Sequence, residues 1–287
     1  MRIWTVRKLL DLLITQFEKH DIASPKQNAE TIISHVLKMK RLDIYFHLEK
    51  EISETQFDII SEISARRKKH EPLQYILGET EFYGYKIMVN KNVLIPRPET
   101  ELLVEKIIHE EKNSARILDI GTGSGAIVIA LAKNLNEMII DAVDISESAL
   151  KTAKQNVDMN NVEINFFQSD IFENVTDKYD LIISNPPYIS QVAYEKLPAE
   201  IREYEPKSAL QAENNGLYFY KKILQNAKEH LTKSGKIYFE IGYDQAEKII
   251  EIAKENGFSN IQVFKDLNGF NRIVRIFNCN EGIWINL

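Results

Sequence analysis

The first 70 residues carry apolar side chains at the three- and four-residue spacing of amphipathic helices. Ser24-Pro25 predicts the start of one helix, with serine as the N-cap and proline at the first helical position. Ser53 and Gln56 form a capping-box pattern that predicts the start of another helix. We therefore expect residues 1–70 to fold as a small helical bundle. Its predicted core positions are Val6, Leu9, Leu10, Leu13, Ile14, Phe17, Ala29, Ile32, Ile33, Val36, Leu37, Phe57, Ile59, Ile60 and Ile63.

Residues 71–96 change in character, because aromatic and β-branched side chains replace the helical spacing. Gly78 and Gly84 interrupt the segment as turn residues do. The pattern predicts a β-hairpin that links the bundle to the rest of the chain. Its strand-type residues are Tyr75, Phe82, Tyr83, Tyr85, Ile87 and Val89.

From residue 97 to the end at residue 287, short apolar runs alternate with helical stretches. Such alternation is typical of an α/β domain with a mainly parallel sheet. The predicted strands fall within residues 115–121, 138–146, 164–170, 179–185, 235–242 and 268–277.

Composition narrows the class of protein without identifying it. The chain is 44% hydrophobic and 27% charged, as globular proteins are. No apolar run is long enough to span a membrane, and Arg7, Lys8 and Asp11 interrupt the N-terminal run, so we expect neither a membrane span nor a signal peptide. Cys279 is the single cysteine and the six histidines show no ligand spacing, which predicts a reduced cytoplasmic protein without a metal.

The charge is unevenly distributed along the chain. Residues 1–70 hold 13 Lys and Arg against 10 Asp and Glu, whereas the remainder holds 23 against 32, within a net charge of −6. The larger part therefore lacks the basic excess that neutralises phosphates, and we expect no direct binding of nucleic acid. The run Arg66 to Lys69 predicts the charged C-terminal turn of a helix, where cations suit the helix dipole.

A glycine loop follows the first predicted strand of the α/β domain and precedes an apolar helix. A strand, glycines and a helix start are typical of a nucleotide-type site, because backbone N–H groups can approach a ligand closely. Asp144 lies nineteen residues after Gly125 at a strand end, where a carboxylate can accept hydrogen bonds from both ribose hydroxyls. A turn needed only for chain geometry is the alternative interpretation. The candidate cofactor residues are Gly121, Thr122, Gly123, Ser124, Gly125 and Asp144.

The charges around this loop indicate which ligand it takes. Asp119 lies two residues before Gly121, Asp144 and Asp170 end neighbouring strands, and the loop contains no Lys or Arg. A dinucleotide pyrophosphate would be repelled, whereas the sulfonium and ammonium of S-adenosylmethionine would be attracted. We therefore predict S-adenosyl-L-methionine as the cofactor.

The run Asn185-Pro186-Pro187-Tyr188 ends the strand at 179–185, on the edge of the sheet that carries the glycine loop. Two prolines stiffen the chain, the Asn185 amide and the Pro186 carbonyl can hold a planar N–H₂ group, and Tyr188 can pack over it. The sequence therefore predicts a rigid slot for a planar nitrogen nucleophile. A plain strand-ending turn is again the alternative, and Asn185 is also close enough to be expected at the cofactor.

This motif after a glycine loop resembles the methyltransferases that modify amino and amide nitrogens. Further runs make the chain similar to the HemK/PrmC family, the peptide chain release factor glutamine methyltransferases. Those runs span 71–84 (EPLQYILGETEFYG), 93–105 (VLIPRPETELLVE), 117–127 (ILDIGTGSGAI), 203–223 (EYEPKSALQAENNGLYFYKKI), 238–242 (YFEIG) and 266–274 (DLNGFNRIV).

The resemblance implies a Rossmann-like class I S-adenosylmethionine-dependent methyltransferase domain at 97–287, after the bundle at 1–70 and the hairpin at 71–96. It implies methyl transfer to the glutamine of the Gly-Gly-Gln motif in bacterial class 1 release factors, with the bundle as a docking module. Asn185, Pro186 and Tyr188 would be catalytic, Asn185 to Tyr188 would hold the substrate, and Ile171 would line the adenine. The segment 96–99 would lie near the entrance of the site.

Two other functions remain open at the level of sequence. A nucleic-acid amino-methyltransferase would share the same motifs, although the acidic balance of the larger part disfavours it. A non-catalytic adaptor that binds S-adenosylmethionine would have no use for the slot at residues 185–188.

Overall fold

The computed structural model describes residues 4–111 and 115–277. Cys279 and the rest of the tail at 278–287 lie outside the described residues. The described chain divides into two compact units. The N-terminal unit comprises Met1–Gly78 and Pro198–Tyr204, and the larger unit comprises Glu79–Leu197 and Glu205–Leu287. The three-part division at residues 70 and 96 stays a prediction.

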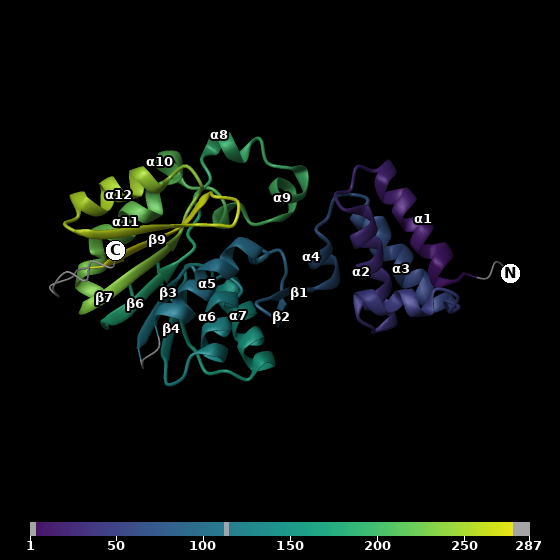
Figure 1. Cartoon of the computed structure of the whole chain (residues 1–287), viewed down its shortest axis with the longest axis horizontal. Helices are drawn as coiled ribbons and strands as arrows, with labels where there is room; N and C mark the ends of the chain where they lie inside the picture. Colours follow the sequence, from purple (N-terminus) through teal and green to yellow (C-terminus); the bar gives the residue numbers. More distant parts are fainter. Residues whose placement is uncertain (1–3, 112–114, 278–287) are drawn as a thin grey trace. The chain divides into compact units, whose positions relative to one another are not determined.

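The N-terminal unit is helical (Figure 1). Its helices are α1 (Val6–Lys19), α2 (Pro25–Leu37), the 3₁₀ helix η1 (Arg41–His47), α3 (Glu54–Arg67), α4 (Leu73–Leu77) and α9 (Ala199–Tyr204). Leu9, Leu13 and Phe17 of α1 are buried together with Ile32 and Ile33 of α2 in one apolar core.

The helix starts test the capping predictions. The Ser53 and Gln56 capping box of α3 is confirmed in both directions. Pro25 opens α2 with Ser24 at the N-cap position, as predicted. Ser24 lies in the left-handed region with φ 50°, and its side chain makes no capping hydrogen bond.

Arg66 and Arg67 lie in the last turn of α3, which confirms the predicted charged end of a helix. Arg67 is only 3% exposed. Its guanidinium donates to Asn28 Oδ1 at 2.8 Å, to the Glu71 carbonyl at 2.9 Å and to Glu200 Oε2 at 2.9 Å. These bonds hold residues 198–204 within the N-terminal unit, together with a hydrogen bond from the Tyr204 hydroxyl to the Lys69 carbonyl.

Within the described residues, the larger unit contains a seven-stranded sheet in the order β5-β4-β3-β6-β7-β9-β8. The first five of these strands are parallel, whereas β9 is antiparallel to both β7 and β8. This confirms the predicted mainly parallel sheet. The strands are β3 (Arg116–Ile120), β4 (Ile139–Asp144), β5 (Asn165–Gln168), β6 (Tyr179–Ser184), β7 (Leu231–Glu240), β8 (Asn260–Lys265) and β9 (Asn271–Phe277).

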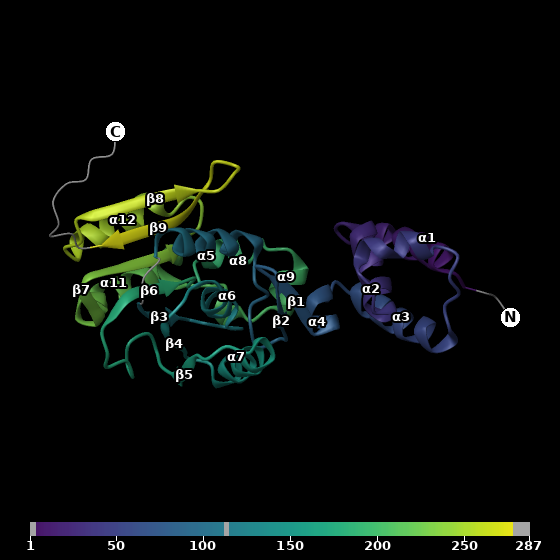
Figure 2. The ribbon, with the colours of Figure 1, turned by 60° about the horizontal axis from the view of Figure 1, so that its bottom comes forward.

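The central strands are nearly continuous apolar runs because helices cover both faces of the sheet. Figures 1 and 2 show α5, α6 and α7 on one face and α11 and α12 on the other. On α11, Tyr220, Ile223, Leu224 and Ala227 form the buried face that packs on the sheet. The helices of this unit are α5 (Pro98–Glu110), α6 (Ala126–Asn134), α7 (Glu147–Asn160), α8 (Gln191–Tyr194), η2 (Lys207–Ala209), α10 (Glu213–Gly216), α11 (Tyr218–His230) and α12 (Ala246–Glu255).

The predicted hairpin is formed by β1 (Glu79–Phe82) and β2 (Tyr85–Met88), which pair in antiparallel register. The turn between them places Gly84 at φ +78°. Tyr75, which the sequence assigned to a strand, lies instead in α4.

Candidate active site

Three neighbouring parallel strands bring the predicted site residues to one edge of the sheet. Ile120, the last residue of β3, pairs with Val143 of β4 and with Ser184 of β6. The Ser184 hydroxyl also donates to the Ile120 carbonyl at 2.7 Å, which ties the two strand ends together. Because Gly121, Asp144 and Asn185 stand at these strand ends, the glycine loop, the acidic residue and the asparagine lie side by side.

The glycine loop turns sharply beside β4. The backbone N–H groups of Gly121 and Thr122 both donate to the Val143 carbonyl, at 2.9 and 3.0 Å. Gly121 and Gly123 have φ of +76° and +57°, a region that strains residues with a Cβ, and a Cβ at either position would meet nothing within 4 Å. The loop therefore leaves open space at its backbone, as the close approach of a ligand requires. Ser124 and Gly125 are buried, and a Cβ at Gly125 would lie 3.3 Å from Ala153 Cβ, so that glycine serves helix packing.

Asp144 is built into this loop by its own hydrogen bonds. Its Oδ2 accepts from the Gly123 N–H and its Oδ1 from the Ser146 N–H, both at 2.9 Å. Burial raises the pKa of the Asp144 carboxyl, whereas these backbone bonds lower it. Each carboxylate oxygen retains a further lone pair that can accept from a ligand hydroxyl.

Asp119 is a site residue that the sequence indicated only as part of an acidic rim. It is completely buried, and neither of its carboxylate oxygens has a hydrogen-bond partner within the described residues. Burial raises the pKa of the Asp119 carboxyl to about 7, with Asp144 adding to the rise. The hydroxyl of Thr122 is likewise buried without a partner in that part of the chain. These unpartnered acceptors beside an open backbone loop fit a cationic ligand, as S-adenosylmethionine is.

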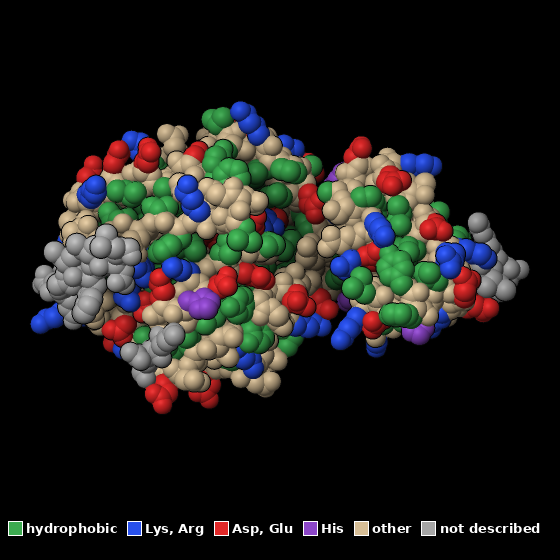
Figure 3. All heavy atoms as spheres, in the orientation of Figure 1, with side chains coloured by type: hydrophobic (Ala, Val, Ile, Leu, Met, Phe, Trp, Pro, Cys, Tyr) green, Lys and Arg blue, Asp and Glu red, His purple; other side chains and the backbone are tan. Residues whose placement is uncertain are grey.

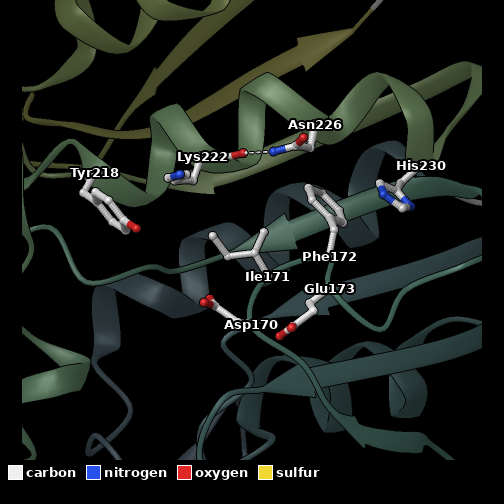
Figure 4. Close-up of a pocket in the computed structure, with 8 residues that line it drawn as sticks. All are labelled: Asp170, Ile171, Phe172, Glu173, Tyr218, Lys222, Asn226 and His230. Atoms are coloured by element: carbon white, nitrogen blue, oxygen red, sulfur yellow. Dashed lines mark hydrogen bonds between the residues drawn. The ribbon is translucent and has the colours of Figure 1, made fainter.

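Ile171 occupies a strained backbone position. Its φ is 54°, in the left-handed region that β-branched residues avoid, and its carbonyl accepts from the Ser169 hydroxyl at 3.1 Å. This conformation places Ile171 at a cavity of about 350 Å³ between the segment after β5 and one side of α11 (Figure 4). In this view the Phe172 ring faces His230, and the two rings stack with centroids 4.3 Å apart. The cavity is lined by Asp170, Ile171, Phe172, Glu173, Tyr218, Lys222, Asn226 and His230.

The segment from Asn185 to Tyr188 is held from several sides. Asn185 Nδ2 donates to the Thr100 hydroxyl at 3.2 Å. Gln245 donates from Nε2 to the Tyr188 carbonyl at 3.0 Å, while its Oε1 accepts from the Gly242 N–H at 3.0 Å. Burial raises the pKa of the Tyr188 hydroxyl to about 12, so it stays protonated.

The backbone that follows the segment is also fixed. Ile189 donates to the Leu210 carbonyl and accepts from the Ala212 N–H, each at 2.9 Å. Gly216 lies so close that a Cβ there would be 1.9 Å from the Tyr188 carbonyl oxygen, and its φ is +84°. Sequence reasoning did not identify Gln245 or Gly216 as site residues; Gly216 lies in the quoted run 203–223, and the run 238–242 ends three residues before Gln245.

The segment 96–99 leads into α5 beside the same strand ends. Arg97 forms an ion pair with the buried Glu205 at 2.5 Å, and the Ile95 N–H donates to the other oxygen of Glu205 at 3.3 Å. This anchors the start of α5, which delivers Thr100 to Asn185.

No group of three or more His, Cys, Asp or Glu in residues 4–111 and 115–277 is arranged to hold a metal ion. Over the same residues, no helix has the length and hydropathy to cross a membrane.

Two family models match separate parts of the chain. Residues 98–201 match the methyltransferase small domain, and residues 8–78 match the PrmC N-terminal domain. In fold the chain resembles a methyltransferase from Pyrococcus furiosus, with a TM-score of 0.53 and 19% identity over 79% of this chain and 98% of that one. It also resembles the 16S rRNA methyltransferase RsmC of T. thermophilus, solved with AdoMet and guanosine, with a TM-score of 0.53 and 16% identity over 70% of this chain and 50% of that one. The fold and the strand-end site thus define a class I methyltransferase.

Curated relatives narrow this class to one family. The release factor glutamine methyltransferase of Thermodesulfovibrio yellowstonii is 43% identical over 86% of this chain and 91% of its own length. That of Fusobacterium nucleatum is 42% identical over 91% of this chain and 75% of its own length. The chain belongs to the release factor glutamine methyltransferase family, as the resemblance of its motifs implied.

Proposed function

We propose that this protein transfers a methyl group from S-adenosyl-L-methionine to the side-chain amide nitrogen of the glutamine in the Gly-Gly-Gln motif of bacterial class 1 peptide chain release factors. The observation that carries the proposal is the Asn185 to Tyr188 segment, fixed at the strand end beside the glycine loop, in a chain of this family. Because such factors work in translation, we expect the protein to act in the cytoplasm.

The cofactor would be held at the ends of β3, β4 and β5. Asp144 is positioned to accept from ribose hydroxyls, Asp119 offers a buried acceptor to a cation, and Ile171 would lie against the adenine. S-adenosylmethionine, when bound, supplies a methyl group that its sulfonium charge has already activated. The protein therefore needs to orient the nucleophile and exclude water, not to polarise the donor.

The nucleophile is a poor one, because the lone pair of an amide nitrogen is delocalised into its carbonyl. In our proposal the Asn185 side-chain oxygen and the Pro186 carbonyl accept hydrogen bonds from the substrate N–H₂ group, which raises electron density on nitrogen and aims its lone pair. Tyr188 packs on the flat amide. Holding two reacting groups in line is worth up to roughly 7–11 kcal/mol in the best cases.

Rigidity is what this mechanism demands of the chain. Gln245 fixes the Tyr188 carbonyl, Gly216 packs against the same carbonyl, and Pro187 restricts the chain in between. The slot therefore does not have to be ordered when the substrate arrives, which reduces the entropic cost of binding.

The charge distribution supports a protein substrate over a nucleic acid. Acidic and basic side chains are interspersed over the face of the larger unit drawn in Figure 3. Residues 71–287 hold 23 Lys and Arg against 32 Asp and Glu, so this part of the chain would not attract a polyphosphate backbone.

The test is incubation of the purified protein with radiolabelled S-adenosylmethionine and three substrates in parallel. These are an intact release factor, the same factor with Gln→Ala in its Gly-Gly-Gln loop, and duplex DNA. We expect label on the intact factor alone. Equal labelling of the Gln→Ala factor, or labelling of DNA, would contradict the proposal.

A further inference from the structure

A buried acidic residue that none of the steps above uses lies next to Asn185. Glu240 is the last residue of β7, one position beyond Phe239, which pairs with Ser184 of β6. It is 3% exposed, and its Oε2 has no hydrogen-bond partner among the described residues. A buried carboxylate without full hydrogen bonding is costly, so its presence here calls for a physical reason.

The neighbours of this carboxylate are Thr100 and Asn185. Asn185 Nδ2 donates to the Thr100 hydroxyl at 3.2 Å, and both side chains lie close enough to the Glu240 carboxylate to lower its pKa. Thr100 is 4% exposed, so water does not compete for these bonds. Three segments that are far apart in the sequence thus meet in one small polar cluster.

The chemistry of the cluster fixes the orientation of the asparagine amide. An asparagine nitrogen carries two hydrogens and no acceptor, whereas an ionised carboxylate only accepts. With one Nδ2 hydrogen on Thr100 and the Glu240 carboxylate beside it as a second acceptor, the amide nitrogen faces the cluster. The Asn185 oxygen must then face the opposite way.

We propose that Glu240 is a positioning residue for methyl transfer, which holds the Asn185 amide so that its oxygen faces the substrate nitrogen. Thr100 takes part in the same arrangement by accepting from Asn185 and donating to Glu240. This inference rests on the proposed function, because it assumes that Asn185 accepts from the substrate. It adds a residue of β7 that acts on the reaction only through Asn185.

The ionisation of Glu240 gives the arrangement a pH dependence. Burial raises the pKa of the Glu240 carboxyl to about 7. Thr100 and Asn185 lower this pKa through hydrogen bonding, the charge of Glu99 raises it, and the charge of Arg272 lowers it. The hydroxyls of Tyr188 and Tyr220 also face it, and both stay protonated. A protonated Glu240 can donate to the Asn185 oxygen and so favour the flipped amide. The rate should therefore rise with pH as Glu240 ionises.

The test compares the wild type with Glu240→Gln, Asn185→Ala and the double variant in single-turnover methylation of a release factor. Because a glutamine side chain is uncharged, does not titrate and can point either its oxygen or its N–H₂ group at Asn185, it no longer enforces one amide orientation; we expect Glu240→Gln to lower the rate about 100-fold and to flatten its pH profile. Affinity for S-adenosylmethionine should stay within about twofold. In the Asn185→Ala background, Glu240→Gln should have no further effect. Glu251→Gln, which removes an exposed carboxylate of α12, is the matched control and should keep the wild-type rate.

Two results would overturn the proposal: a wild-type rate in Glu240→Gln, or a further large loss when it is added to Asn185→Ala. If Glu240→Gln does not fold, Thr100→Val and Thr100→Ser replace it, and only the serine, which keeps the hydroxyl, should restore the rate.

A readout without substrate separates this proposal from the proposed function. The Asn185 side-chain N–H₂ signals, assigned by their absence in Asn185→Ala, should exchange slowly with solvent in the wild type and faster in Glu240→Gln. If the wild type labels no release factor, the proposed function fails, whereas unchanged exchange in Glu240→Gln would still reject the role of Glu240.

Discussion

Asn185 and Asp144 stand at the ends of the two strands that flank β3, yet they are expected to hold different molecules. Asp144 is bonded into the glycine loop, and Asn185 is bonded to Thr100. Removing each side chain should therefore affect different measurable steps.

For Asn185→Ala we expect turnover to fall by about 100-fold or more, because the amide nitrogen of the substrate is no longer aligned. Affinity for S-adenosylmethionine, measured by calorimetry, should change by less than about twofold because the contacts of the loop remain. A variant with the wild-type methylation rate would rule out the slot mechanism.

For Asp144→Ala we expect cofactor binding to weaken by on the order of 1–3 kcal/mol, as the loss of charge-assisted hydrogen bonds predicts. Calorimetry would measure it, with Asp158→Ala as the control, since Asp158 is an exposed carboxylate of α7. Equal affinities for the wild type and Asp144→Ala would remove Asp144 from the cofactor site.

At the scale of single residues, the sequence pointed to those whose neighbours along the chain mark them. Asp144 and Asn185 each end an apolar strand, and the glycine loop before Asp144 and the prolines after Asn185 made them candidates. The meeting of Thr100, Asn185 and Glu240 could not be predicted, because it depends on the register of β6 beside β7 and on the placement of α5. Burial of Asp119 without partners is likewise a property of the packed sheet.

At the scale of elements, the turn before α11 supports the segment that follows β6. Gly216 touches the Tyr188 carbonyl, whereas Gly269, in the turn between β8 and β9, has the same sign of φ at +83° and nothing within 4 Å of a built Cβ. Substitutions at these two glycines therefore distinguish the cost of steric overlap from the cost of backbone strain.

We expect Gly216→Ala to lower the free energy of unfolding by about 1–3 kcal/mol from overpacking, in addition to about 1–2 kcal/mol for the left-handed backbone, and to reduce methylation as Tyr188 moves. Gly269→Ala should show only the backbone effect and keep its methylation rate. Chemical denaturation and single-turnover assays measure the two quantities. Equal free energies of unfolding for the two variants would mean that the turn before α11 shifts to accommodate the added Cβ at no energetic cost.

The sequence predicted the elements well where both faces of a strand are buried. The run in β6 is apolar at almost every position, so its assignment needed no knowledge of the fold. The edge strand β8 went unpredicted, because Asn260 to Lys265 mixes polar and apolar residues and gains its structure by pairing with β9. The predicted start of β9 at residue 268 was early, since residues 268–270 form the turn that Asp266 holds with hydrogen bonds to Asn268 and Phe270.

At the scale of the whole molecule, two buried carboxyls should shape the stability of the ligand-free protein. Burial raises the pKa of Asp119 from 3.8 and that of Glu240 from 4.5, both to about 7. Between about pH 4 and 7 the folded protein then binds more protons than the unfolded chain. The stabilisation from these groups is complete below their ordinary pKa and is lost as pH rises to about 7.

We therefore expect the melting temperature of the ligand-free protein to fall between about pH 5 and pH 8, with a contribution on the order of 1–4 kcal/mol from each carboxyl. Asp119→Asn should show a shallower decline, because it removes one of the two titrating groups. Calorimetric melts over this range test the expectation. Parallel declines in the wild type and the variant would show that Asp119 does not titrate there.

Residues 198–204 determine where the two units of this protein can be separated by truncation. The polypeptide leaves the larger unit after Leu197, and Glu200 then accepts a hydrogen bond from Arg67. The chain returns to the larger unit at Glu205, which forms an ion pair with Arg97. A shortened chain that begins at Glu79 would lack Arg67, so Glu200 would lose its ion-pair partner. Residues 198–204 would then lack the rest of the unit to which they belong. An exchange of the N-terminal unit between homologues would thus have to replace two separate segments, Met1–Gly78 and Pro198–Tyr204, at the same time.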